Sequence, residues 1–327
     1  MRAATAGDQA AFAQLVERYR SELQVHAYRM LGSLEDAQDA LQEAFLRAWT
    51  GRSTYRGEST FRAWLYRITT NVCLRVLERR PRRIGPYEAG PAAELGARPA
   101  DPVDLPWLQP YPDVLLDESP EPDDAVVARE TIELAFLAAI QHLPPRQRAV
   151  LILRDALDWP TDDTAAVLEM SLAAVNSALQ RARATMKEQL PARRLDWSTA
   201  DDAEDEERSL LQTYVEAFER HDDRALVALL REDVRMAMPP HPTWYDGRKA
   251  VDVFLAEVAF RIDSGTHRFV PTRANRHPAF GVYRGQGADA TPFAINVVEI
   301  ESGQIAAMHF FLYPELFPAF GLPAHLG

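Results

Sequence analysis

Nine prolines between residues 84 and 124 constrain the fold of this chain more than any other feature. Proline blocks the interior of a helix and removes a backbone donor from a strand. The same stretch holds ten acidic residues against one basic residue, so it cannot bury a core of its own. We expect an extended linker, in which Trp107 and Tyr111 are free rather than docked on a neighbour. The 327 residues then divide into separate domains on either side of it.

Amphipathic helices are predicted upstream of this linker. Apolar residues recur at steps of three and four across residues 9–31, and Gly32-Ser33 ends the pattern. A second helix follows Ser33, and a third runs from Thr60 to about Arg79. The sequence therefore predicts an all-helical domain over residues 1–83.

Helical patterns resume in residues 125–194. A short helix at 162–168 and a longer one at 171–190 are joined through Glu169-Met170-Ser171, which gives the proportions of a helix-turn-helix. Along the longer helix an apolar stripe lies beside a stripe of amide and guanidinium side chains. Such side chains suit base edges and phosphates, although a solvated helix face has the same composition.

The pattern changes again after a short acidic linker, residues 195–208. Residues 209–327 combine predicted helices at 209–220, 223–231 and 248–260 with five strand-like runs. This order favours an α+β domain with helices packed on one face of a curved, mostly antiparallel sheet.

The net charge of −12 argues against nucleic-acid binding only as an average. Residues 1–83 hold 14 basic and 9 acidic side chains, a net of +5, while the two linkers are strongly acidic. The single cysteine, Cys73, excludes an intrachain disulfide and favours a reducing cytoplasm. We expect no membrane span, because no stretch approaches the roughly 18–20 apolar residues required.

Four segments resemble parts of bacterial RNA polymerase sigma factors. Asp36–Trp49 resembles the segment that binds the polymerase clamp, and Thr60–Leu74 is similar to the reader of the promoter −10 element. Leu143–Leu151 and Ala174–Arg183 resemble the −35 reader. Their order and spacing are typical of the extracytoplasmic-function (ECF) branch, which has only these two domains.

The resemblance implies site residues at matching positions. The residues implied to bind core polymerase are Asp36, Asp39, Gln42, Glu43, Phe45, Arg47 and Trp49. Those implied to bind the −10 element are Arg56, Phe61, Arg62, Trp64, Arg67, Asn71, Arg79 and Arg80. Those implied to bind the −35 element are Ser171, Ala174, Asn176, Ser177, Gln180, Arg181, Arg183 and Lys187. For Phe45, Phe61 and Trp64 a place in the core is the favoured alternative.

The −35 reader departs from the family pattern at two places. Ala178 stands where many ECF factors have a basic residue, and the preceding helix starts with the acidic pair Asp162 and Asp163. Both departures leave the −35 sequence open.

Residues 209–327 resemble SnoaL-like members of the NTF2-like superfamily, which are cone-shaped domains with a pocket. The resemblance lies in Leu211–Asp222, Asp233–Pro240 and Trp244–Gly247. The candidate ligand-pocket residues are Met236, Met238, Trp244, Tyr245, Phe254, Arg273, Asn275, His309 and Phe311. His309 lies in an apolar run and is more typical of a core residue than of an acid–base catalyst.

The sequence thus predicts a multidomain chain: two all-α sigma domains, one a helical bundle and one a helix-turn-helix, followed by an α+β SnoaL-like cone. We expect a non-enzymatic, cytoplasmic sigma factor whose partners are core RNA polymerase and promoter DNA. No metal or cofactor is expected, and a small-molecule ligand of the C-terminal domain stays open. Two alternatives are a ligand-sensing helix-turn-helix regulator and a SnoaL-type isomerase or cyclase with an accessory DNA-binding module.

Overall fold

The computed structural model describes residues 7–57, 59–116, 132–190, 203–260, 266–285 and 287–326. The chain forms two compact units, which share the linker between them. The helical unit takes residues up to Arg83, Leu108–Tyr111 and Leu115–Arg194. The C-terminal unit takes Ile84–Trp107, Pro112–Val114 and Leu195–Gly327.

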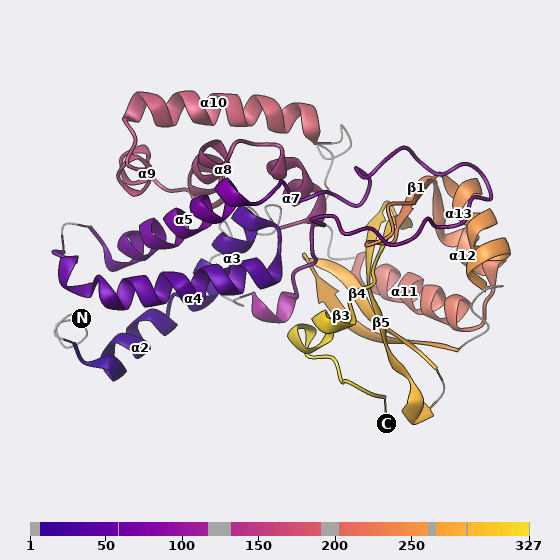
Figure 1. Cartoon of the computed structure of the whole chain (residues 1–327). Helices are drawn as coiled ribbons and strands as arrows, with labels where there is room; N and C mark the ends of the chain where they lie inside the picture. The colour runs from indigo at the N-terminus through magenta and orange to yellow at the C-terminus, as the bar shows by residue number, and fades with distance from the viewer. Residues whose placement is uncertain are drawn as a thin grey trace. The chain divides into compact units, whose positions relative to one another are not determined.

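The first half of the helical unit is a bundle of four helices, coloured indigo to purple in Figure 1. They are α2 (Gln9–Glu17), α3 (Arg20–Leu31), α4 (Leu34–Thr50) and α5 (Phe61–Arg79). The single helix expected over 9–31 is broken at Arg18-Tyr19 into α2 and α3. Gly32 ends α3 in the left-handed conformation, and the Ser33 side chain caps α4 by accepting from the Asp36 N–H.

The second half of this unit holds the helix-turn-helix. Its helices are α7 (Leu134–Gln141), α8 (Pro145–Leu151), α9 (Thr161–Leu168) and α10 (Leu172–Gln189), with a π-helical turn at Ile152–Ala156. Glu169 ends α9 with a left-handed φ of 54°, and the Ser171 hydroxyl caps α10. The predicted helix-turn-helix is confirmed.

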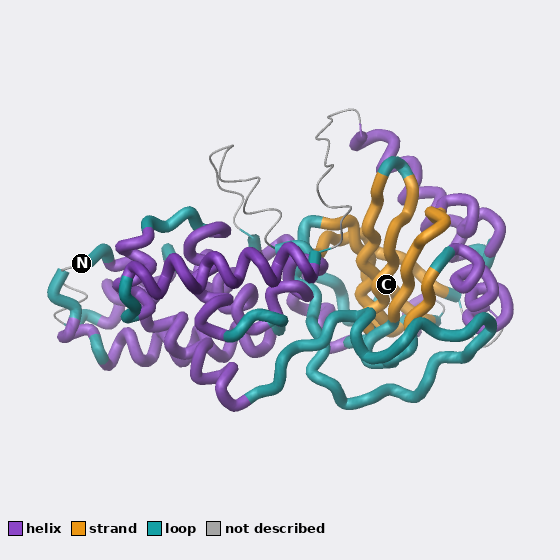
Figure 2. Tube along the Cα trace, turned by 90° about the horizontal axis from the view of Figure 1, so that it is seen from above, coloured by secondary structure: helices purple, strands orange, loops and turns teal. Residues whose placement is uncertain are grey.

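The C-terminal unit is a six-stranded sheet with helices on one face (Figure 2). The strands are β1 (Leu230–Ala237), β2 (Trp244–Asp246), β3 (His267–Ala274), β4 (His277–Arg284), β5 (Thr291–Glu301) and β6 (Gln304–Phe311). Their order is β2-β1-β6-β5-β4-β3, and only β1 and β6 run parallel. The helices are α11 (Ala203–Glu219), α12 (Asp223–Leu229) and α13 (Arg248–Phe254), which a π-turn at Leu255–Ala259 extends. The α+β architecture is confirmed, and α11 begins inside the stretch expected to be the second linker.

The core of the cone is aromatic. Tyr214 and Phe218 of α11 pack with Phe269 and Phe280 at ring-centroid distances of 5.2–6.2 Å. All four are buried in one cluster that spans the three helices and the inner face of the sheet. The other face of the sheet is also apolar, and the 3₁₀ segment Pro314–Phe320 packs against β5.

The first linker is packed rather than free, contrary to expectation. Trp107 is 2% exposed and pairs through its backbone with Ile84, and Tyr111 is fully buried with its ring 4.6 Å from Tyr28. Within the C-terminal unit the Gly90 and Ala97 carbonyls accept hydrogen bonds from side chains of the β2 strand. The composition argument was wrong here because main-chain carbonyls of a proline-rich segment can still bind a neighbouring domain.

Candidate partner and nucleic-acid interfaces

The polar ridge predicted on α4 is exposed. Asp39 and Gln42 are exposed, Glu43 pairs with Arg47 along the helix, and Ala37, Ala40, Leu41, Ala44 and Ala48 form the buried side. This burial follows from the spacing of the apolar residues and leaves one side of α4 available to a partner.

Three other predicted α4 residues contact side chains of the bundle. Phe45 is half-buried beneath the Arg20 guanidinium, which lies 5.1 Å from its ring. Trp49 packs on Phe12 at 5.2 Å. Asp36 is 8% exposed and accepts hydrogen bonds from Arg80 and Arg83, so it joins the start of α4 to the end of α5. The structure therefore gives Asp36 a structural position instead of one on the exposed ridge.

Leu46 was missed by the sequence reasoning. Its side chain is 62% exposed, next to Gln42 on the open side of α4. The signal was present in the sequence, because Leu46 is apolar yet falls outside the buried stripe of its helix.

Of the residues predicted to bind the −10 element, on and before α5, some are buried in the core and others are exposed. Phe61 and Trp64 are 4% and 5% exposed, and their rings lie 5.4 Å apart in a cluster with Tyr55. Both are core residues in this structure rather than open stacking surfaces. The exposed side chains are Arg56, Arg67, Arg79 and Arg80, with Asn71 half-buried.

Arg62 is held by an internal ion pair. It donates to Glu22 Oε2 from Nε at 2.8 Å and from Nη2 at 2.6 Å, and the Tyr66 hydroxyl donates to the same oxygen at 3.2 Å. Burial alone would lower the pKa of Arg62, but its contacts with Glu22 and Tyr66 raise it above the ordinary value. The Trp159 ring, just before α9, covers this group at 4.8 Å from the Tyr66 ring.

A hollow of about 480 Å³ lies between α5 and the start of α8. Asn71, Leu74 and Arg75 line it from α5, and Pro144 and Arg146 line it from the other side. Of the predicted −10 residues, Asn71 alone lines this hollow.

The second helix of the helix-turn-helix, α10, turns its predicted −35 residues outward. Ser171, Asn176, Ser177, Gln180, Arg181, Arg183 and Lys187 are exposed, and Ala174 is half-buried. Ala178 is 3% exposed and lies in the core, so the absence of a basic residue there does not alter the outward face. Arg183 donates to both Asp155 oxygens, at 2.9 and 2.7 Å, which raises its pKa.

Arg148 joins the two halves of the helical unit. It is 2% exposed and donates from α8 to the Met30 carbonyl at the end of α3. Its other acceptors are the Gln141 side chain at 2.8 Å and the Gln141 and Leu143 carbonyls at 2.9 and 3.3 Å. Burial, together with the charge of Arg82, lowers the pKa of Arg148 to about 10, so the guanidinium stays charged at neutral pH.

The candidate pocket residues of the C-terminal unit do not converge on one site. Met236, Tyr245 and Phe254 belong to the core cluster, with Met238 packed against it. His309 is adjacent to Met308 on β6 and so faces the other side of the sheet, as does Phe311. Arg273 and Asn275 lie at the β3–β4 turn, where Arg273 pairs with Asp113 at 3.4 Å.

His309 and Trp244 contact the linker instead. The Tyr87 hydroxyl lies 3.4 Å from His309 Nδ1, and His309 Nε2 lies 3.1 Å from Glu299 Oε1. The Trp244 indole donates to the Gly90 carbonyl at 2.9 Å and packs on the Tyr87 ring at 5.3 Å. These two predicted pocket residues thus bind the linker at Tyr87 and Gly90.

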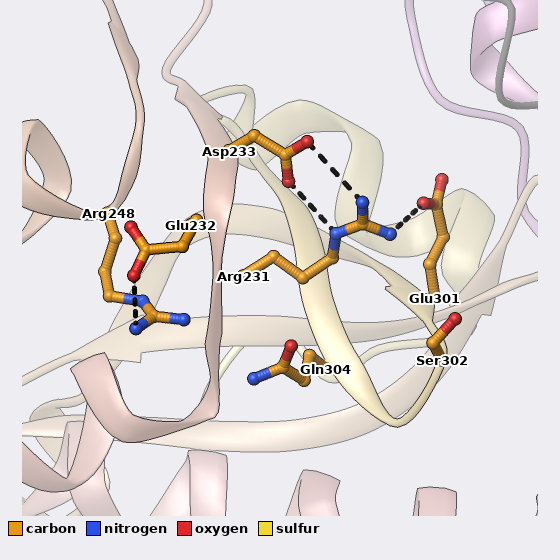
Figure 3. Close-up of a pocket in the computed structure, with 7 residues that line it drawn as sticks. All are labelled: Arg231, Glu232, Asp233, Arg248, Glu301, Ser302 and Gln304. Atoms are coloured by element: carbon orange, nitrogen blue, oxygen red, sulfur yellow. Dashed lines mark hydrogen bonds and ion pairs between the residues drawn. The ribbon is translucent and has the colours of Figure 1, made fainter.

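A polar hollow of about 410 Å³ lies elsewhere in this unit. Figure 3 shows the residues that line it. Arg231 pairs with Asp233 and Glu301, and Arg248 pairs with Glu232 at 3.0 Å. Because each arginine is matched by carboxylates, the hollow has no excess positive charge. None of the predicted pocket residues lines it.

The described ranges contain neither a metal-binding cluster nor a membrane-spanning helix. Residues 7–57, 59–116, 132–190, 203–260, 266–285 and 287–326 contain no cluster of three or more His, Cys, Asp or Glu side chains fit to hold a metal ion. Over the same part of the chain, no helix has both the length and the hydropathy to cross a membrane.

Comparison with known proteins gives matches to all three segments. Family models match for Sigma-70 region 2 over residues 15–83, for Sigma-70, region 4 over 133–186, and for the SnoaL-like domain over 211–308. The chain is 40% identical over 318 residues to the ECF RNA polymerase sigma factor SigG of Mycobacterium tuberculosis (strain ATCC 25618 / H37Rv), covering 96% of this chain and 85% of that protein. It is 30% identical over 185 residues to the ECF RNA polymerase sigma factor SigW of Bacillus subtilis (strain 168), covering 56% of this chain and 91% of that protein.

One solved structure is similar over nearly the whole chain. The Mycobacterium tuberculosis extracytoplasmic function sigma factor SigJ superposes with a TM-score of 0.58 at 22% identity, covering 95% of this chain and 99% of that one. At this identity the likeness is one of fold.

Proposed function

The chain belongs to the ECF RNA polymerase sigma factors with a SnoaL-like C-terminal domain, and from this premise we propose how its surfaces divide the work of initiation. The open side of α4 binds core RNA polymerase. The exposed arginines on and before α5 bind the −10 region, and the outward face of α10 reads the −35 duplex. The observation that carries the proposal is that the amide and basic side chains of α10, the second helix of the helix-turn-helix, are exposed after its Ser171 N-cap.

Run-off transcription with purified core polymerase tests this proposal. The full chain should give promoter-dependent transcripts. Gln42→Ala should weaken binding to core polymerase, while Gln14→Ala, an equally polar change at an exposed position of α2, should not. If the full chain neither binds core polymerase nor directs transcripts, the stand-alone helix-turn-helix regulator becomes the better description.

We further propose that the C-terminal domain sets activity through the linker that joins the two sigma domains. The support is a set of hydrogen bonds between residues 90–103 and the β1–β2 region. The Ala93 N–H donates to the Trp244 carbonyl at 2.8 Å, and the Val103 N–H donates to the Pro240 carbonyl at 3.1 Å. The Tyr245 hydroxyl adds a bond to the Ala97 carbonyl at 3.0 Å. A linker held in this way can span only a limited range of distances, and this range limits how far apart the two promoter-binding domains can lie.

Trp244→Phe tests this second proposal, because it keeps an aromatic ring and removes the indole donor to Gly90. Transcript yield should change several-fold. Tyr283→Phe is the matched control, since it removes a 2.6 Å bond to the Pro323 carbonyl in the same domain without touching the linker. Equal yields from wild type and both variants would contradict regulation through the linker.

We also propose that the C-terminal domain catalyses no reaction and that the protein acts in the cytoplasm, where promoter DNA lies. The cone interior is filled by its own side chains, with Tyr214 donating to Asn296 Oδ1 at 2.9 Å within an aromatic core. Isomerase or cyclase turnover by the purified full chain would contradict the first of these proposals.

A further inference from the structure

Leu172 is an exposed leucine at the first position of α10. Its side chain is 49% exposed, and it is one of four large hydrophobic residues that are exposed among the described parts of the chain. Leu179, seven residues later and within about 20° of the same direction on the helix, is only 6% exposed. The core of the helix-turn-helix therefore ends before it reaches Leu172.

The surroundings of Leu172 are those of a DNA-reading surface. Asn176 and Gln180, one and two turns further along α10, are both exposed. Arg183 and Lys187 lie within about 60° of Leu172 around the helix, Arg183 is paired with Asp155, and α10 carries no carboxylate before Glu188. The residues near the start of the second helix of a helix-turn-helix are the ones that reach base edges in the major groove.

A leucine side chain can make an apolar contact with only one group in the major groove. An isobutyl side chain has no donor or acceptor, and the apolar group that a base pair presents in the major groove is the C5-methyl of thymine. We infer, on the basis of the proposed −35 function, that Leu172 contacts a thymine methyl and makes this chain select thymine at one position of the −35 element. Asn176 and Gln180 then read the positions beside it.

The test removes the methyl group alone. Promoters are first selected with the full chain and core polymerase from a library randomised over the −35 element. Each selected thymine is then replaced singly by deoxyuridine, and polymerase holoenzyme binding is measured. At one position the wild type should bind the deoxyuridine promoter about fourfold more weakly, the loss expected for one buried methyl group.

Leu172→Ala should remove that dependence. It should bind thymine and deoxyuridine promoters equally at this position and lose the thymine preference in a repeated selection. Val114→Ala, at a valine that is 70% exposed and lies outside residues 84–107, is the control and should keep the wild-type dependence. Unchanged helicity would confirm that Leu172→Ala is folded, as expected for alanine at an exposed helix position.

Three results would overturn the inference. In the first, the wild type binds and transcribes but no deoxyuridine substitution weakens it. In the second, Leu172→Ala keeps the methyl dependence. In the third, Leu172→Ala weakens binding equally on every promoter, which would assign the leucine to backbone or polymerase contact. Absence of any promoter-specific binding by the wild type would instead overturn the proposed function, and the inference with it.

Discussion

Replacing Arg148 with methionine removes the donor that serves four buried acceptors. These are the Met30 and Leu143 carbonyls and the carbonyl and side-chain oxygens of Gln141. A buried acceptor left without a donor costs about 1–3 kcal/mol. Removing a desolvated charge returns part of that loss. We therefore expect Arg148→Met to lower the unfolding free energy of the helical unit by about 3–5 kcal/mol.

Guanidinium unfolding combined with hydrogen exchange measures this effect. The transition of the helical unit should move to lower denaturant concentration, and exchange should accelerate at the end of α3 and in α7–α8, where the acceptors lie. Arg79→Met, at an exposed position of α5, is the control and should change stability by less than about 0.5 kcal/mol. A loss below about 1 kcal/mol for Arg148→Met would refute the argument, since it would mean that water or other donors satisfy these acceptors.

Three further predictions follow from single contacts. Gly32→Ala should destabilise the helical unit by about 1–2 kcal/mol, because the φ of residue 32 is +66° and an added Cβ would lie 2.9 Å from Leu108 Cδ1. The melting temperature should fall accordingly, and an unchanged value would contradict this. Tyr214→Phe should destabilise the C-terminal unit in urea by about 1–2 kcal/mol, since Asn296 Oδ1 loses its donor while its Nδ2 has no partner among the described residues. Burial, reinforced by Arg29 and Arg62, lowers the pKa of His26 to about 3, so the unfolded chain binds the extra proton and stability should fall as pH decreases from 6.5 towards 3. His26→Gln should flatten that part of the stability–pH curve, and an unaltered slope would rule out His26 as its source.

Local patterns were enough to predict most of the helices and strands. The apolar spacing in α4 and α10 correctly separated Leu41 and Leu179 from Gln42 and Gln180, because burial on a helix follows a fixed period. The fold class followed from the order of such elements. The short strand β2 was missed, since three residues are too few to show an alternation.

Long-range pairings lay beyond the sequence. Nothing near Asp36 predicts that its carboxylate meets Arg80 and Arg83, more than forty positions away. The candidate pocket residues lie on different sides of the sheet for a related reason. Strand neighbours such as Met308 and His309 face opposite sides of a sheet, and only the register with β1 and β5 decides which side is the cone.

The docking of the linker on the β1–β2 region has a consequence for how the protein is made. Gly90 and its partner Trp244 are 154 positions apart, so residues 84–107 leave the ribosome long before their binding site exists. At roughly 5–20 residues per second, that interval is about 8–30 s. During synthesis both sigma domains are therefore completed while the segment joining them has no partner. The Gly90 carbonyl can therefore meet its donor on Trp244 only after β2 has been translated.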